Sequence, residues 1–216
     1  MRAFVERWAV PALRGLLGRE QPPEDGMTCR GCREPTTISP TRYRCCDCLN
    51  PPVLCKSCIL RSHAHTPFHF VSEWDVRRRF WRRQPLASLG VVLDLGHDGE
   101  RCTYASGTPR PMCIVSEHGV HELGVRFCGC LDKATRATTP DATQLLRHGL
   151  WPASWQQPRT AFTINVLKTF SLLSHQGNVN AYDYIEVLRR KTDGTVTQGT
   201  VVSLMSLDRT LVDNID

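Results

Sequence analysis

The chain has 216 residues and a formal charge of +6 at pH 7, with 27 lysine and arginine residues against 21 acidic ones. This length holds one ordinary domain or two small ones, and the charge is compatible with a polyanionic partner without requiring one. The 11 cysteines are an odd number in a sequence with no apolar leader, which disfavours disulfides and favours metal-bound thiolates in a reducing compartment. No stretch is apolar over the roughly 18 residues that a bilayer span needs, so no membrane partner is expected.

The first 26 residues are predicted to form a helix followed by a linker. Apolar residues from Phe4 to Leu17 follow a loosely helical spacing, and Pro11 interrupts it, so we predict a kink at that proline. Residues 21–26 include two prolines and a glycine, which is the composition of a linker.

Cysteine pairs followed by histidines dominate residues 27–72, and their spacing is typical of structural zinc sites. Such sites use thiolates two residues apart, with further thiolates or imidazoles completing a tetrahedron. We predict a cross-braced module in which pairs one and three share one ion, while pair two and two histidines share a second. The predicted ligands are Cys29, Cys32, Cys55 and Cys58 for the first ion and Cys45, Cys48, His63 and His69 for the second. The spacing also permits sequential pairing, and His65 is an alternative to His63.

Residues 73–140 contain a basic run and then a second Cys/His cluster. Five arginines surround Phe80 and Trp81 in the run: Arg77, Arg78, Arg79, Arg82 and Arg83. On a helix the two aromatic residues would pack inward while several guanidinium groups reach solvent. That arrangement suits contacts with DNA phosphates and a nuclear localisation signal, and a merely solvated basic face is the alternative.

The second cluster is centred on Cys128-Gly129-Cys130, where the glycine lets the backbone turn so that both sulfurs face one ion. With Cys102 and His121 this pair predicts a third zinc site, and His97 is a competing fourth ligand. Cys113 and His118 are expected to lie outside it. Strands are predicted at 91–95 and 120–127.

Residues 141–193 are predicted to be helical, with helices at 142–148, 163–175 and 181–191, and the tail 194–216 shows no period. The fold class that follows is a small, zinc-stabilised α+β protein. It consists of a cross-braced zinc module, a short β-rich second zinc region and a helical C-terminal part.

The order of these motifs resembles two families. The Tyr43-Arg44-Cys45 start, the next cysteine pair and the final histidines are similar to ZZ-type zinc fingers, which bind protein tails. A longer series, spread over residues 5–193, resembles the cysteine-cluster domain of fungal Kyakuja–Dileera–Zisupton (KDZ) transposases. Its pieces are Tyr43-Arg44-Cys45, Pro67-Phe68-His69, Leu95-Gly96-His97, Gly119-Val120-His121, Val125 to Cys130, Trp151-Pro152-Ala153 and Pro158 to Thr163. In this resemblance His63 and His69 take the histidine positions.

The resemblance implies a fungal, transposon-derived protein of the nucleus. Full-length members carry their catalytic RNase H-like core beyond the cysteine cluster, and Asp94, Asp98 and Asp183 do not lie in such a context. The tail from Gly194 departs from the family pattern. We therefore expect a non-catalytic zinc module that binds DNA, with a ZZ-like reader of a peptide tail as the alternative.

Overall fold

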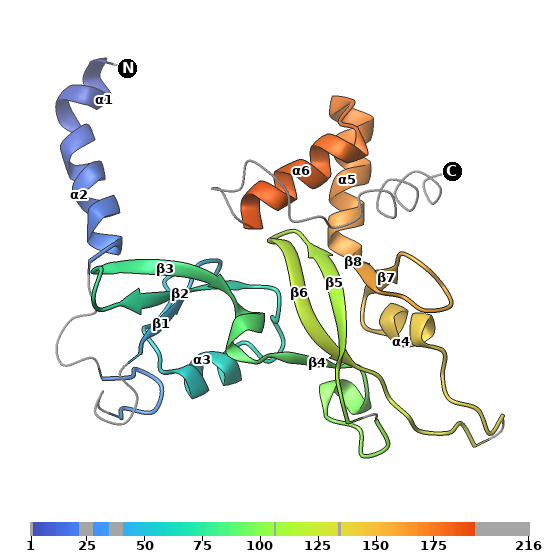
Figure 1. The fold of residues 1–216 in the computed structure, drawn as a ribbon. Helices are drawn as coiled ribbons and strands as arrows, with labels where there is room; N and C mark the ends of the chain where they lie inside the picture. The colour runs from blue at the N-terminus through green and yellow to red at the C-terminus, as the bar shows by residue number, and fades with distance from the viewer. Residues whose placement is uncertain (1, 22–27, 35–40, 106, 134, 193–216) are drawn as a thin grey trace. The chain divides into compact units, whose positions relative to one another are not determined.

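In the computed structural model the chain forms two compact units, Met1–Leu89 and Gly90–Asp216, and residues 2–21, 28–34, 41–105, 107–133 and 135–192 are described (Figure 1). This division differs from the predicted boundaries at 72/73 and 140/141. The basic run joins the first unit, and the predicted helical part shares a sheet with the region before it. The predicted tail lies outside the described residues. Within the described residues, no helix has the length and apolar character needed to cross a membrane.

The chain begins with two short helices, α1 (Arg2–Arg7) and α2 (Ala9–Arg19). The break lies at Trp8 and not at Pro11, where the kink was predicted. Pro11 is in the first turn of α2, where backbone N–H groups have no intrahelical acceptor, so its missing N–H is tolerated there. Its ring conflicts instead with the carbonyl four residues earlier, at Arg7, which is where α1 ends.

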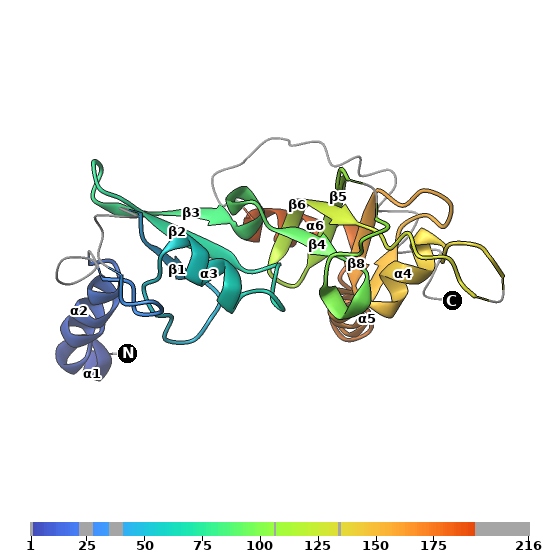
Figure 2. The same cartoon turned by 90° about the horizontal axis from the view of Figure 1, so that it is seen from below.

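The first unit is built on an antiparallel sheet of β1 (Tyr43–Cys45), β2 (Phe70–Asp75) and β3 (Phe80–Pro85), in that order. The short helix α3 (Lys56–Ser62) packs beside β1, and the 3-10 turn η2 (Leu86–Leu89) follows β3 (Figure 2). The basic run, considered above as it would lie on a helix, is not helical. The run is the turn and second strand of a hairpin, because β2 supplies a pairing partner for every residue of β3.

The second unit contains a five-stranded mixed sheet in the order β4-β6-β5-β8-β7. The long strands β5 (Arg110–Ser116) and β6 (Gly119–Arg126) form a hairpin. The short strands β4 (Val92–Asp94) and β8 (Thr160–Thr163) flank it in parallel, and β7 (Leu150–Pro152) closes the edge. The strands predicted near 91–95 and 120–127 are therefore confirmed.

Three helices complete the second unit: α4 (Asp141–Arg147), α5 (Ile164–Gly177) and α6 (Ala181–Thr192), close to the predicted ranges. The Thr163 hydroxyl caps α5 by accepting the Val166 N–H, and the helix ends at Asn178 in the left-handed conformation. A buried core joins the sheet to both long helices, with Phe162 from β8, Phe170 from α5 and Leu188 from α6 among its members.

Candidate metal centres

Cysteine and histidine side chains gather at three places in the described part of the chain, each with four ligand atoms within 4.8 Å of one another. The first centre is Cys29, Cys32, Cys55 and Cys58, the second is Cys45, Cys48, His63 and His69, and the third is His97, Cys102, Cys128 and Cys130. The first two centres have the residues and the interleaved order predicted from spacing. In the third, His97 takes the place predicted for His121.

The ligand atoms of each centre lie close to the spacing that zinc requires, with the His97 Nε2 3.5 Å from the Cys130 sulfur and 3.9 Å from the Cys128 sulfur. A tetrahedral ion with Zn–S bonds of about 2.3 Å sets its sulfurs roughly 3.8 Å apart, and sulfur and nitrogen roughly 3.5 Å apart. The Cys32 and Cys55 sulfurs are 3.8 Å apart, and both sulfur pairs of Cys102 in the third centre are 3.6 Å apart. In the second centre the sulfur–nitrogen distances are 3.4 to 3.5 Å. The donors present therefore fit Zn²⁺, which these residues would hold.

Helix α3 links the first two centres through its two ends. Cys55 is the residue before the helix and Cys58 lies in its first turn, so both sulfurs reach the first centre. His63 follows its last residue and belongs to the second centre. A seven-residue helix is too short to be stable alone, so ligation at both ends would add to the stabilisation that its packing against β1 and η2 supplies.

Backbone groups orient the ligands of the second centre. The Nδ1 of His63 lies 3.0 Å from the carbonyl oxygen of Ile59, which makes Nδ1 the protonated nitrogen and leaves Nε2 for the metal. The carboxylate of Asp47, between two ligands, accepts the Phe70 N–H at 2.6 Å. The loop carrying Cys45 and Cys48 is thus tied to β2, directly after the ligand His69.

The first centre receives backbone hydrogen bonds at one sulfur. The N–H groups of Gly31 and Cys55 donate to the Cys29 sulfur at 3.3 and 3.2 Å. Burial alone would raise the pKa of Cys29, but N–H groups of Cys32, Cys55 and Gly31 outweigh it and lower the pKa to about 6. Cys29 is thus ready as a thiolate, the form that binds metal.

Other ligands of the same centres have the opposite tendency. Burial, followed by the neighbouring cysteines, raises the pKa of Cys58 to about 12. Burial also raises the pKa of Cys45 to about 12. Several thiolates this close cannot all be charged without a cation between them, and a bound dication reverses that preference. The Arg61 guanidinium donates to the Cys58 sulfur at 3.3 Å and adds positive charge beside the four-cysteine site.

The third centre is assembled from loops around the second unit's sheet. Cys128 and Cys130 follow β6, Cys102 comes from the loop before β5, and His97 lies just after β4. His97 is exposed, and both it and Asp98 have positive φ angles, of 45° and 60°. Left-handed backbone at two successive non-glycine residues is strained, and a metal bound by His97 would hold the loop in this conformation.

Gly129, between two ligands of this centre, has a different role from the one predicted. Its φ angle is not positive, so the backbone there does not require a glycine for a left-handed turn. A Cβ at this position would instead collide with the carbonyl oxygen of Tyr104. The close approach lets the Gly129 N–H reach the Cys102 sulfur. Burial raises the pKa of Cys102, but this bond, His97 and Tyr104 outweigh it and lower the pKa to about 6.

A buried glutamine holds the third centre from outside, and sequence reasoning missed it. The Gln144 side chain, 3% exposed, accepts the Cys128 N–H at 2.8 Å and donates to the Cys128 carbonyl at 3.1 Å and to the Thr139 carbonyl at 2.8 Å. Both of its polar atoms are therefore used on backbone groups, and two of the three bonds are to the ligand Cys128 itself. The available signal was a polar residue on the inner face of a predicted helix.

His121 is the one predicted ligand that the structure places elsewhere. It is 2% exposed in β6, and its Nε2 lies 2.9 Å from the hydroxyl of Ser116 across the β5–β6 hairpin. The alternation of the strand points it into the interior near the hairpin's closed end, whereas Cys128 and Cys130 lie beyond the opposite end of β6. His97, the weighed alternative, takes the position because it follows the parallel neighbour β4.

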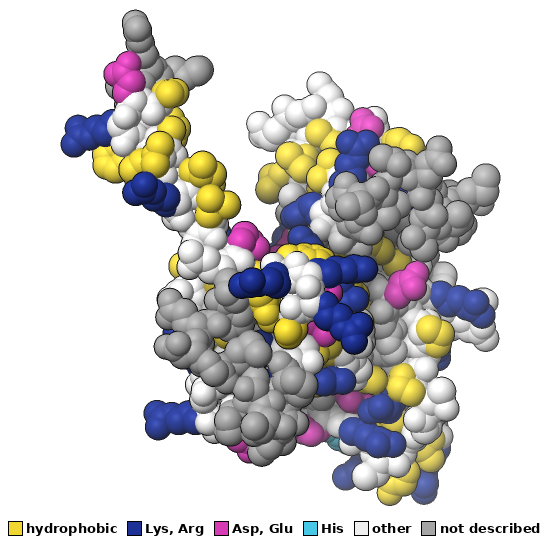
Figure 3. Space-filling model, turned by 60° about the vertical axis from the view of Figure 1, so that its left-hand side comes forward, with side chains coloured by type: hydrophobic (Ala, Val, Ile, Leu, Met, Phe, Trp, Pro, Cys, Tyr) yellow, Lys and Arg dark blue, Asp and Glu magenta, His cyan; other side chains and the backbone are white. Residues whose placement is uncertain are grey.

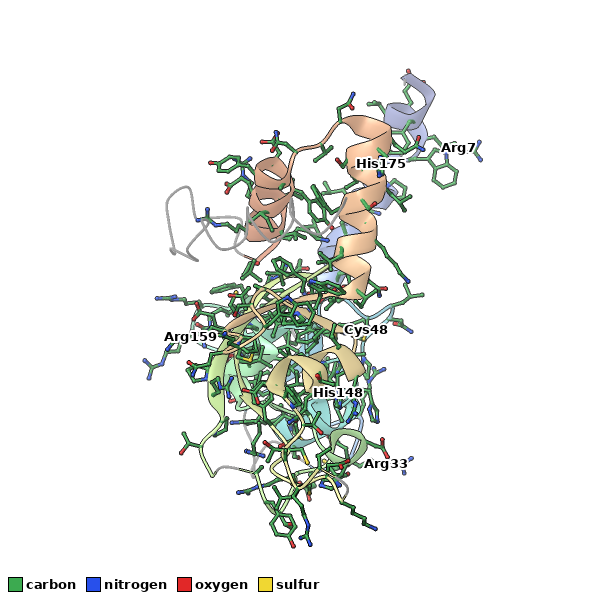
Figure 4. All side chains as sticks on the ribbon, turned by 90° about the vertical axis from the view of Figure 1, so that its right-hand side faces the viewer. Arg7, Arg33, Cys48, His148, Arg159 and His175 are labelled. Atoms are coloured by element: carbon green, nitrogen blue, oxygen red, sulfur yellow. The ribbon has the colours of Figure 1, made fainter. Side chains whose placement is uncertain are left out.

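The remaining cysteines and histidines lie outside the three centres. His65 is exposed and is not part of the second centre. Burial raises the pKa of Cys113 in β5 to about 11, and Cys46 lies 3.0 Å from the Ser72 hydroxyl. His148 caps the end of α4 and His175 lies in the last turn of α5 (Figure 4). All 11 cysteines are free of disulfides.

The comparison with known families rests on the second unit. Residues 86–196 match the sequence profile of a family described as CxC2 like cysteine cluster associated with KDZ transposases, which is just over half of the chain. The chain belongs to this CxC2 family. The CxC2 match contains the third centre and every described element from β4 to α6. It starts later than residue 5, where the predicted resemblance began, so the first two centres precede it.

A CxC2 cluster is an accessory domain that accompanies transposases and is not a catalytic one. No curated protein and no solved structure matches the chain. In this chain the CxC2 segment contains a Cys3His centre, a five-stranded sheet and two long helices.

Proposed function

We propose that this chain is a zinc-stabilised, non-catalytic module of a transposase-like protein, and that it binds DNA in the nucleus through the β2–β3 hairpin. Its CxC2 membership and its three zinc-type centres support the transposase-associated part. One observation carries the DNA contact: the hairpin ends in three consecutive exposed arginines. Lys and Arg side chains gather around hydrophobic ones near the middle of the face drawn in Figure 3.

The turn of the hairpin is constructed so that its arginines face solvent. The Asp75 carboxylate accepts the backbone N–H groups of Arg77 and Arg78 at 3.0 and 2.9 Å, and the Asp75 carbonyl accepts the Arg79 N–H. These bonds, first the one from Arg78, keep the pKa of Asp75 below its usual value. Because its carboxylate is used on the backbone, the three guanidinium groups make no salt bridge within the described residues.

The two arginines of β3 are held in place by neighbours. Arg82 pairs with Glu73 at 2.7 Å, yet its side chain is 56% exposed. Arg83 lies over the ring of Phe70, 4.1 Å from its centroid. A two-stranded β-ribbon fits the major groove of B-DNA, and arginines at its tip can contact the backbone phosphates that border the groove. A hairpin, and not the helix considered above, thus presents these charges.

The alternative function, a ZZ-like reader of a basic peptide tail, needs an acidic surface beside the second centre. The cavity at that place is lined by Arg19, Arg30 and Arg44 with Glu20 as its only acidic residue. A basic tail would be repelled there, whereas a polyanion would be attracted. This charge balance favours DNA.

The test is fluorescence anisotropy of the zinc-loaded chain with labelled random duplex DNA at two salt concentrations. We expect micromolar binding that weakens with salt. In the Arg77→Ala, Arg78→Ala, Arg79→Ala variant, binding should weaken at least about tenfold and the slope of log K against log salt should fall by roughly 2.7. The matched control removes three exposed arginines of the second unit, by Arg136→Ala, Arg147→Ala and Arg159→Ala. Equal weakening by both variants would contradict a hairpin contact, and absence of binding at low salt would contradict DNA binding altogether.

A further inference from the structure

A cavity of about 710 Å³ lies beside the second centre, between the end of α2 and the loop that carries Cys45 and Cys48. Its wall combines basic, apolar and backbone groups. The side chains that define its character are Arg19, Arg30, Arg44, Glu20, Leu49 and Trp81. Leu49 is almost fully exposed, whereas Trp81 is 8% exposed.

The charges of this wall are unbalanced. Three arginines face one carboxylate, and that carboxylate is paired with only one of them: both Glu20 oxygens lie 3.0 Å from Nη2 of Arg44. Arg19 and Arg30 make no salt bridge to another described residue. The cavity therefore has two guanidinium groups available to an anion in addition to Arg44.

Arg44 is already oriented to receive an anion. Its guanidinium lies over the Trp81 ring, 4.4 Å from the centroid, and it also donates to the Arg19 carbonyl. The indole N–H of Trp81 donates to the Gln21 carbonyl at 3.1 Å, which holds the segment after α2 against the sheet. A planar guanidinium fixed by stacking is well suited to a carboxylate or a phosphate, which offer it the same oxygen geometry.

We infer that this cavity binds a phosphate group of a nucleic-acid backbone, and that the Glu20 carboxylate occupies the phosphate position on Arg44 until DNA displaces it. The inference rests on the proposed function for the source of the phosphate. Trp81 belongs to β3, the strand that also carries Arg82 and Arg83, so DNA held by the hairpin is near the cavity. The exchange conserves charge on Arg44, and the incoming phosphate gains Arg30 and Arg19 as further partners.

Two substitutions test this without disturbing the Arg44–Trp81 stack. Glu20→Gln removes the competing charge, so DNA affinity should rise about three- to tenfold, and the salt slope should steepen by roughly one phosphate contact. Arg30→Ala should lower the affinity severalfold. The matched control is Glu6→Gln, which removes the same charge from α1 and should stay within about twofold of the unmodified chain. Zinc content and circular dichroism verify that each variant is folded.

The DNA titrations are run with and without a 5′-phosphate, and a second titration uses inorganic pyrophosphate, followed by tryptophan fluorescence. Equal affinity for the two duplexes identifies backbone phosphates as the source, and preference for the 5′-phosphorylated one identifies the strand end.

If Glu20→Gln and Glu6→Gln behave alike while the hairpin variant loses binding, the cavity inference is overturned and the proposed function stands. If no variant binds DNA, the proposed function fails, and the pyrophosphate titration then shows whether the cavity binds an anion at all. Saturation of Glu20→Gln at lower pyrophosphate than Glu6→Gln supports an anion site, and identical curves refute it. Tighter binding of a phosphoserine peptide than of DNA would overturn the nucleic-acid assignment.

Discussion

The two units of the chain place their candidate metal centres differently. In the first, five of the eight ligands are buried, and the ligands stand at both ends of α3 and beside β1 and β2, where a small domain would place its core. In the second, the core of Phe162, Phe170 and Leu188 lies between sheet and helices, and the single centre is made by loops. A structural metal would thus supplement a small core in the first unit and fix loops in the second.

Removal of metal should produce the largest difference in stability between the two units. Structural zinc contributes about 10–16 kcal/mol in small zinc modules, which is as large as the whole stability of an ordinary domain. A strong chelator at neutral pH should therefore abolish amide protection in β1, β2 and α3, while β5, α5 and α6 stay protected. Hydrogen exchange resolved by segment measures this. Persistent protection of β2 after complete metal removal would show that the first unit has a sufficient core of its own.

The next largest effect distinguishes His97 from His121. His97→Ala should reduce zinc from three ions per chain to two in the presence of a competing chelator, because one ligand of four is lost. His121→Ala should keep all three but lower the free energy of unfolding by about 1–3 kcal/mol, because a buried imidazole and its hydrogen bond to the Ser116 hydroxyl are lost from the interior. Metal analysis and urea unfolding of both variants provide the comparison. Zinc loss in His121→Ala with retention in His97→Ala would reverse the assignment made here.

Local spacing identifies the cysteine ligands of the first unit, but it leaves sequential pairing and the choice between His63 and His65 open, and it fails where the fold decides. The spacing reveals the ligands of the first centre, because two residues separate the cysteines of each pair, Cys29 and Cys32, and Cys55 and Cys58. Interleaved pairing is the arrangement that holds both ends of a short chain. The choice between His97 and His121 depends on a parallel pairing of β4 with β6, which no local pattern contains.

The same limit explains the basic run. Arg77 to Arg83 has no alternation that distinguishes strand from helix, and its conformation is set by pairing with β2. The Trp74–Trp81 contact across that pair, with ring centroids 5.2 Å apart, is visible only once the register is known. The charges were predictable from the sequence, and their presentation was not.

A smaller effect is expected at the third centre from the residue that supports it. Gln144→Ala removes two hydrogen bonds to the Cys128 backbone and one to Thr139 without changing a ligand, so zinc affinity at this centre should fall about 10–100-fold. The first two centres, in the other unit, should be unaffected. Chelator competition with cobalt as a spectroscopic substitute measures each affinity, and Thr143→Ala on the same helix is the control. An unchanged third-centre affinity would mean that the loop positions Cys128 without the glutamine.

The smallest effect concerns the cysteine of the second unit that binds no metal. Burial, with a contribution from Glu122, raises the pKa of Cys113 to about 11, so its folded form favours the neutral thiol. In zinc-loaded protein with Cys46→Ser, alkylation of Cys113 should be slow at pH 7.5, and its rate should rise about tenfold per pH unit to pH 9.5 without levelling. An exposed thiol would level near pH 9 because its pKa is about 8.5. Because the raised pKa lies in the folded state, this thiol stabilises the second unit below pH 9, and that contribution is lost as pH rises towards 11. A plateau near pH 9 would show instead that Cys113 is open to solvent, and that the sheet around it is looser than the core of α5 and α6.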